Sequence, residues 1–274
     1  MTGGKITNCI ETGIAVAMKA YAKISGNAVL EGSAGSLAYN YGVLDMMDMA
    51  KDGWVLTNGF DREDLPQTDV VRDEKKLRIV YCGYISEGRK NAPHRDLSPM
   101  MTTIRQLIDE GMLSQEEVQL VYAGSQSSLF EQVAAASGLE ACVEDHGMVS
   151  RRVSIGLQLS ADILLMASWH SAAQKGILTG KLFEYMMMDK PIVCCMGGTL
   201  PNSGVKQVLA QTGMGICCEH ANAQADEEAL LSYVRRLIAS WKAGGNMLSD
   251  KKETEVESYA YPGLARTLEG WMEE

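Results

Sequence analysis

The segment "TGKLFEY" (179–185) places a cation and an acid one helical turn apart, at the predicted start of a helix. The first N–H groups of a helix lack intrahelical partners and carry partial positive charge, so they can bind phosphate. Thr179, Gly180 and Lys181 lie where this would occur. Glu184 follows one turn later, where its carboxylate could accept two hydrogen bonds from a ribose diol. The alternative is that Glu184 only favours the helix dipole and that Lys181 is a surface charge.

A second candidate phosphate site is the loop "GYISEGRKNAPHRDL" (83–97), which follows a predicted strand. Gly83 would let the main chain approach a ligand, and the guanidinium groups of Arg89 and Arg95 could hold phosphate oxygens with two parallel bonds. Lys90 adds a further cation. The spacing is neither G-x-G-x-x-G nor a Walker loop, and a solvated basic turn is the alternative interpretation.

The turn "EDHGMVSR" (144–151) could present main-chain groups to the edge of a nucleobase around Gly147. His146 could instead be an ordinary loop histidine. The four histidines form no H-x-x-H or H-E-x-x-H arrangement, so we expect no metal held by the protein. The stretch "AGSQS" around Gly124 lacks the second glycine of a serine nucleophile elbow.

Short apolar runs alternate with helical patterns from residue 54 onward, and these elements must position the candidate residues. Nearly continuous hydrophobicity within a run is typical of parallel strands that are buried on both faces. The expected strands are 54–58, 77–83, 118–124, 141–145, 161–168, 190–196 and 214–219. The pattern predicts an α/β fold with an open, doubly wound, Rossmann-like parallel sheet. In such sheets ligands bind beyond the carboxyl ends of the strands.

Apolar residues three and four apart predict the intervening helices. These are expected at 99–111, 127–138, 150–160, 180–189, 202–213 and 225–244, with one more amphipathic helix in the tail. The first 53 residues show a different pattern. Residues 6–24 carry apolar side chains at helical spacing, and the segment that follows is first glycine-rich and then again favours helix. We therefore expect a helical N-terminal segment, 1–53, and a nucleotide-binding domain, 54–274.

The overall composition argues against some classes of binding partner and indicates the cellular compartment. The chain has 274 residues, a formal net charge of −10 and 46% hydrophobic residues, which argues against a general affinity for nucleic acid or anionic membrane. Its seven cysteines show no C-x-x-C spacing, which favours a reducing cytoplasm. No run reaches the roughly 18 apolar residues that a spanning helix needs. A contact with the inner face of the membrane stays open.

Six segments, taken in order, resemble the donor-binding domain of group 1 glycosyltransferases with the two-domain B fold. They are "VLTNGFDREDLP", "LRIVYCGYISEGRKN", "LVYAGS", "DHGMVSR", "LQLSADILLMAS" and "GILTGKLFEYMMMDKPIVCC". The resemblance spans roughly residues 54–273. It implies that the chain forms one half of a B fold, with an atypical or truncated N-terminal part.

The resemblance also implies roles for individual residues. Glu184 would bind the ribose of a sugar nucleotide, Lys181 and the turn before it would lie at the donor phosphates, and Gly147 would face the base. Basic side chains and aligned N–H groups would stabilise the departing nucleoside diphosphate, so no cofactor is expected beyond the donor substrate itself. The expected substrate-binding set is Gly83, Arg89, Lys90, Gly124, His146, Gly147, Thr179, Gly180, Lys181 and Glu184.

The sequence departs from the family pattern at two places. Gly176 stands where many members have a second glutamate that contacts the donor sugar. Only 53 residues precede the predicted nucleotide-binding domain, where the family has an acceptor-binding domain of similar size, so no catalytic base is assigned. We expect either a piece of a longer chain or a shortened protein that needs a partner.

Three functions remain open at this point. The first is a glycosyltransferase that moves a sugar from a nucleoside-diphosphate sugar to a glycan or lipid-linked acceptor in cell-surface polysaccharide synthesis. The second is a non-catalytic nucleotide-sugar-binding subunit that works with a partner chain or as a homo-oligomer. The third, a sugar-nucleotide epimerase, would need carboxylates and a histidine in the cleft, and the sequence offers no convincing set.

Overall fold

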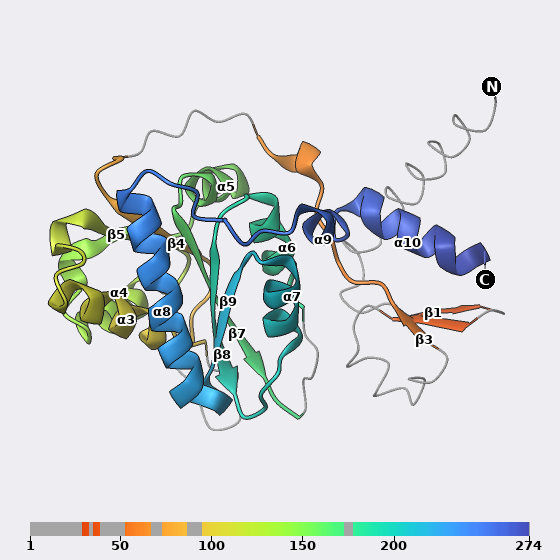
Figure 1. Cartoon of the computed structure of the whole chain (residues 1–274), viewed down its shortest axis with the longest axis horizontal. Coiled ribbons are helices and arrows are strands. Elements are labelled where there is room, and N and C mark those ends of the chain that lie inside the picture. The colour runs from red at the N-terminus through yellow and green to blue at the C-terminus, as the bar shows by residue number, and fades with distance from the viewer. Residues whose placement is uncertain are drawn as a thin grey trace.

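A six-stranded parallel sheet forms the centre of the protein in the computed structural model, which describes residues 29–32, 35–38, 53–66, 73–86, 95–172 and 178–273. The strand order is β6-β5-β4-β7-β8-β9, and every neighbouring pair is parallel (Figure 1). The strands are β4 (Leu77–Cys82), β5 (Val118–Ala123), β6 (Val143–Asp145), β7 (Ile163–His170), β8 (Ile192–Gly198) and β9 (Gly215–Glu219). The predicted α/β, doubly wound, Rossmann-like sheet is confirmed.

Helices cover both faces of this sheet, which is why its strands are apolar on both sides. One face packs against α3 (Ser98–Asp109), α4 (Ser127–Ala135) and α8 (Ala223–Lys242), and the other against α5 (Arg151–Leu159), α6 (Gly180–Met187) and α7 (Gly204–Thr212). All six residues of β4 are buried. Tyr81 packs in the core on the side of α3, α4 and α8, and Val80 in the core on the side of α5, α6 and α7. Short 3-10 turns occur at Arg62–Asp64, Gln115–Glu117, Glu140–Cys142 and His220–Asn222.

The strand order fixes where a ligand would bind. The chain builds outward from β4 through β5 to β6, then returns to the other side of β4 with β7. Beyond the carboxyl ends of β4 and β7 the connections therefore diverge to opposite faces, and such switch points are where open α/β sheets bind ligands. Gly83 follows β4 directly, and α6 is the next described helix after β7.

The strand predicted at 54–58 does not belong to this sheet, which is a correction to the sequence analysis. β3 (Gly53–Val55) pairs with β2 (Gly35–Ala38), and β2 pairs with β1 (Val29–Gly32), in a separate three-stranded sheet. The residues that follow β3 pair with the C-terminal segment, because Phe60 N donates to Tyr259 O at 3.2 Å and Tyr261 N donates to Phe60 O at 2.9 Å.

Strands β1 and β2 also lie within the segment that the sequence predicted to be helical, so that prediction is wrong for these two ranges. Backbone pairing between neighbouring strands, rather than local periodicity, decides the structure there. The predicted helical stripe over 6–24 lies outside the described residues.

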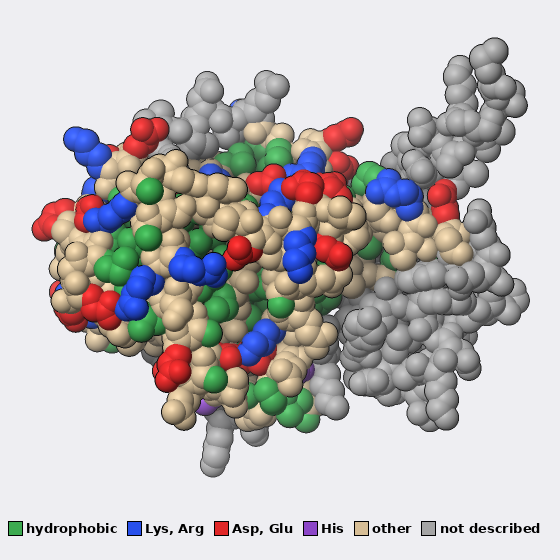
Figure 2. All heavy atoms as spheres, in the orientation of Figure 1, with side chains coloured by type: hydrophobic (Ala, Val, Ile, Leu, Met, Phe, Trp, Pro, Cys, Tyr) green, Lys and Arg blue, Asp and Glu red, His purple; other side chains and the backbone are tan. Residues whose placement is uncertain are grey.

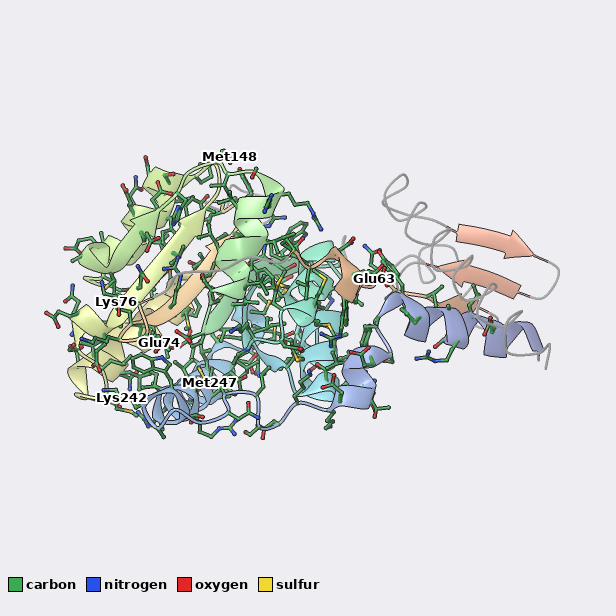
Figure 3. All side chains as sticks on the ribbon, turned by 90° about the horizontal axis from the view of Figure 1, so that it is seen from above. Glu63, Glu74, Lys76, Met148, Lys242 and Met247 are labelled. Carbon is green, nitrogen blue, oxygen red and sulfur yellow. The ribbon has the colours of Figure 1, made fainter. Side chains whose placement is uncertain are left out.

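The C-terminal part forms α9 (Glu253–Glu257) and α10 (Tyr261–Glu273). The amphipathic pattern of the tail predicted α10. Figures 1 and 3 both show α10 beside the small sheet of β1–β3, away from the six-stranded sheet. Leu264 and Ala265 at its start are buried, and Leu264 packs at Gly59. Within the described residues, none of the helices is long and apolar enough to cross a membrane.

The charged side chains are mixed over the face shown in Figure 2. Lys and Arg side chains alternate with Asp and Glu side chains there, and no broad patch of a single sign forms among the described residues of that face. The described residues of this face therefore form no extended track for a polyanion.

Candidate functional site

Lys181 lies across the carboxyl end of β4, at the switch point of the sheet. It is the second residue of α6, and its side chain reaches Gly83. Gly83 has φ +149°, and a Cβ at this position would lie 2.1 Å from Lys181 Nζ. An alanine at this position would therefore displace the ammonium group, and its backbone would keep a φ that L residues rarely adopt.

The ammonium of Lys181 is partly buried, and no described carboxylate forms an ion pair with it. Its Nζ lies 4.6 Å from the centroid of the Tyr81 ring. The pKa of Lys181 is lowered to about 8, mainly by burial and less by the charge of Arg95, while Cys82 and Glu184 act in the opposite direction. Among the described residues, Lys181 Nζ makes no ion pair and no hydrogen bond. A bound anion would supply the missing partner.

Substituting Gly83 with alanine should disturb both the fold and the lysine. The new Cβ would meet Lys181 Nζ, and the backbone would keep a conformation that L residues rarely adopt, so we expect a loss of about 1–2 kcal/mol of stability. Gly156→Ala is the matched control, because nothing lies within 4 Å of a Cβ there and an alanine inside α5 should stabilise by roughly 0.5–1 kcal/mol. Urea unfolding of both variants measures the contrast, and equal stability of the two would contradict it.

The N-terminus of α6 offers further groups to an anion. Thr179 is the N-cap residue with extended backbone, and its hydroxyl makes no capping hydrogen bond. Leu182 N donates to Thr179 O at 3.0 Å, whereas Gly180 N and Lys181 N have no acceptor among the described residues. The helix dipole and these N–H groups favour negative charge in front of Gly180.

Glu184 faces an open cleft rather than the core. Its neighbours Phe183 and Tyr185 are fully buried, but its own side chain is 24% exposed. Arg151 Nη1 donates to Glu184 Oε2 at 3.0 Å, and Gln158 Nε2 donates to Oε1 at 2.8 Å. The cleft has a volume of about 450 Å³, and its wall includes Asn58, Gly59, Arg151, Gly180, Glu184 and Tyr261.

The ends of β5 and β6 are joined to the end of β4 through the main chain. Gly83 N donates to Ala123 O at 2.8 Å, and Gly124 N donates to Gly147 O at 2.9 Å. Gly147 has φ +58°, which suits glycine, and its N–H donates to Asp145 Oδ1 at 2.9 Å. These bonds place the three loops at one edge of the sheet.

The ring of His146 is turned toward a carboxylate. His146 Nε2 lies 2.6 Å from Glu144 Oε1, and Glu144 also contacts Arg78. Met148, labelled in Figure 3, is 77% exposed beside Gly147 at the periphery. The expected base contact at His146 and Gly147 stays a prediction.

The structure thus brings together part of the expected set. Gly83, Gly124 and the Lys181 ammonium meet at the end of β4, because a Cβ at Gly124 would lie 2.2 Å from Gly83 O. Thr179 and Gly180 begin α6, and Glu184 follows one turn along that helix. His146 and Gly147 lie toward the β5–β6 edge. Arg89 and Lys90 lie outside the described residues, as does Gly176.

Three residues make contacts that the sequence pattern did not predict. Arg151 and Gln158 hold Glu184, and Arg95 lies close enough to Lys181 to affect its pKa. The basic loop 83–97 indicated Arg95 as a candidate, but the loop sequence did not predict that this residue lies near Lys181. The i, i+7 spacing of Arg151 and Gln158 places them on one face of α5, which was the available signal for that pair.

Comparison with known proteins supports the fold. No protein-family model and no curated protein matches the chain. Among solved structures, HepE from Anabaena in complex with UDP and glucose matches at TM-score 0.56 and 13% identity, over 96% of this chain and 67% of that one. The lipopolysaccharide outer core galactosyltransferase WaaB matches at 0.53 and 14%, over 86% and 60%. Sucrose-phosphate synthase from Thermosynechococcus elongatus matches at 0.51 and 12%, over 85% and 55%.

These likenesses define a class of fold. The chain has a B-type, glycosyltransferase-like fold, and the predicted resemblance is confirmed at that level. At such identities the similarity concerns the fold alone. The chain spans between 55% and 67% of the lengths of these three proteins.

Proposed function

We propose that the chain binds a nucleoside-diphosphate sugar at the switch point and forms the donor-binding part of a glycosyltransferase. The observation that carries this proposal is the partly buried Lys181 ammonium, which has no acidic partner among the described residues. It lies at the N-terminus of α6, one turn before Glu184. Cation, helix N-terminus and carboxylate are the groups that a diphosphate and a ribose require.

The chemistry of transfer follows from this arrangement. When the bond between the anomeric carbon and the terminal phosphate oxygen breaks, negative charge develops on the departing diphosphate. In this proposal Lys181 and the N–H groups of Gly180 and Lys181 would stabilise that charge, and Glu184 would hold the ribose while it develops. The acceptor hydroxyl forms the new bond at the anomeric carbon and releases its proton to a base that we leave unassigned.

The acceptor class is inferred from the structural neighbours. One of them carries UDP and glucose, and another is a galactosyltransferase of the lipopolysaccharide outer core. We therefore propose a glycan or lipid-linked acceptor in cell-surface polysaccharide synthesis. Six described cysteines are buried and unpaired, which supports the cytoplasm as the compartment.

The same site would also suit a subunit that binds the donor and leaves transfer to a partner chain. Donor turnover separates the two functions. Release of nucleoside diphosphate from a donor sugar by this chain alone would favour the enzyme, and tight binding without release would favour the subunit.

A thermal-shift panel with UDP, GDP and ADP tests the proposal. A ligand at about 100 times its Kd should stabilise the protein by about 2.7 kcal/mol, and one base should stand out. The control Lys242→Met, on the exposed surface of α8 beside Glu117, should keep the full shift. Absence of any shift with all three nucleotides at millimolar concentration would overturn the proposed function.

A further inference from the structure

We propose that Arg95 is a second cation of the diphosphate site, held in place between the rings of Tyr84 and Trp169. The inference rests on the proposed function and adds a residue that discriminates a diphosphate from a monophosphate.

Two aromatic rings fix the guanidinium of Arg95. Its Cζ lies 4.7 Å from the centroid of Trp169 and 5.7 Å from that of Tyr84. Nη1 is 3.4 Å from Tyr84 O, and the main-chain N–H of Arg95 donates to Ser86 O at 3.3 Å. Trp169 is in β7 and Tyr84 follows β4, so the side chain bridges the two strands that flank the switch point.

The ring of Tyr81 connects this clamp to Lys181. Tyr81 Oη donates to Tyr84 O at 2.7 Å, which is the carbonyl beside Arg95, and the same ring lies 4.6 Å from Lys181 Nζ. The two cations are close enough for the charge of Arg95 to lower the pKa of Lys181. Among the described residues, no carboxylate forms an ion pair with either of them.

Two neighbouring cations that share no acid repel each other until an anion binds. Aromatic rings over a guanidinium leave the N–H donors at its edge available. Nη1 of Arg95 donates to Tyr84 O, and the other edge donors can bind phosphate oxygens. A point-like ammonium and a planar guanidinium side by side suit two linked phosphates better than one. The ligand class is therefore a pyrophosphate ester, and Arg95 contributes little to a monophosphate.

Calorimetric titration tests this assignment with UDP, GDP and ADP, the matching monophosphates, and inorganic pyrophosphate. We expect Arg95→Gln to weaken diphosphate and pyrophosphate binding by about tenfold or more and to change monophosphate binding by less than about twofold. Arg95→Lys should recover only part of the loss, because an ammonium cannot stack and fork in the same way. Arg236→Gln is the matched control and should bind normally. Arg236 on α8 also lies over a tyrosine ring, with its Cζ 5.4 Å from the centroid of Tyr233.

The positioning role of Trp169 gives an independent readout. Trp169→Leu should weaken diphosphate binding in the same direction as Arg95→Gln, and the double variant should be no weaker than the more affected single one. Unchanged diphosphate affinity in Arg95→Gln, or an equal loss for mono- and diphosphate, would overturn the inference and leave the proposed function standing. Failure of the wild type to bind any diphosphate or pyrophosphate would overturn both.

Discussion

Replacing Lys181 with methionine is expected to stabilise the free protein while it abolishes stabilisation by a nucleoside diphosphate. The ammonium is partly buried, its pKa is lowered to about 8, and it has no acidic partner in the described structure, so its charge costs folding energy at neutral pH. Methionine has a similar shape and can remain against the Tyr81 ring. We expect the free energy of unfolding to rise by roughly 1–3 kcal/mol and nucleotide protection to disappear.

Lys206 provides the contrasting control, because it is also a partly buried lysine but has acidic partners. Its Nζ lies 2.6 Å from Asp226 Oδ2 and 3.5 Å from Glu219 Oε2, and both carboxylates are buried. Burial lowers the pKa of Lys206, but the bond to Asp226 and the charge of Glu219 raise it by more. Lys206→Met should therefore destabilise the fold by about 3 kcal/mol, since it leaves buried charge unpaired. Loss of stability in both variants would contradict a destabilising charge at Lys181, and full nucleotide protection in Lys181→Met would contradict its binding role.

The low pKa of Lys181 also predicts opposite pH dependences for binding and folding. Only the protonated lysine attracts phosphate, so diphosphate affinity should fall about tenfold between about pH 7 and 9, with a pKa of about 8. The unfolded chain holds this proton until about pH 10.4, so the contribution of Lys181 to stability should rise over about pH 8 to 10. Titrations of wild type and Lys181→Arg measure the first effect. A diphosphate affinity of the wild type that does not change between about pH 7 and 9 would contradict this prediction.

Glu184→Ala is expected to lower the affinity for a nucleoside diphosphate by at least about tenfold with little loss of stability. Two hydrogen bonds from a ribose diol to a charged acceptor contribute roughly 1.5–3 kcal/mol each. In the ion pair with Arg151, the arginine side chain is 69% exposed and the Glu184 side chain 24%, so loss of the pair should cost under about 1 kcal/mol. Gln158 keeps its bond to Ser154 Oγ at 3.1 Å. Glu110→Ala, which breaks a comparable surface pair with Arg235, is the control and should bind normally.

The fold could be predicted because its strands are apolar on both faces. The run "LRIVYC" of β4 and the run "IVCCM" of β8 read as buried parallel strands, and the alternation with helices fixed the rest. The run 54–58 looks the same in sequence but pairs elsewhere. Its position is set by pairing with β2 and by the bonds of Phe60 to the C-terminal segment. A local sequence pattern does not predict such long-range pairing.

The candidate site was predictable only where its residues are local in the chain. Lys181 and Glu184 share one helix, so their spacing predicted that they act on the same ligand. Arg95 depends on Trp169, which is distant in sequence, and no spacing rule connects the two. Arg89 and Lys90 lie outside the described residues and stay predictions.

A thermodynamic cycle on the ribose tests the binding site most directly. The best-binding nucleoside diphosphate and its 2′,3′-dideoxy analogue are titrated into wild type and Glu184→Ala. Removal of both hydroxyls should weaken binding to wild type by at least about tenfold and to Glu184→Ala by less than about twofold, because the carboxylate is the partner of the diol. The same loss in both proteins would show that Glu184 does not hold the ribose, and the site would have to be placed elsewhere.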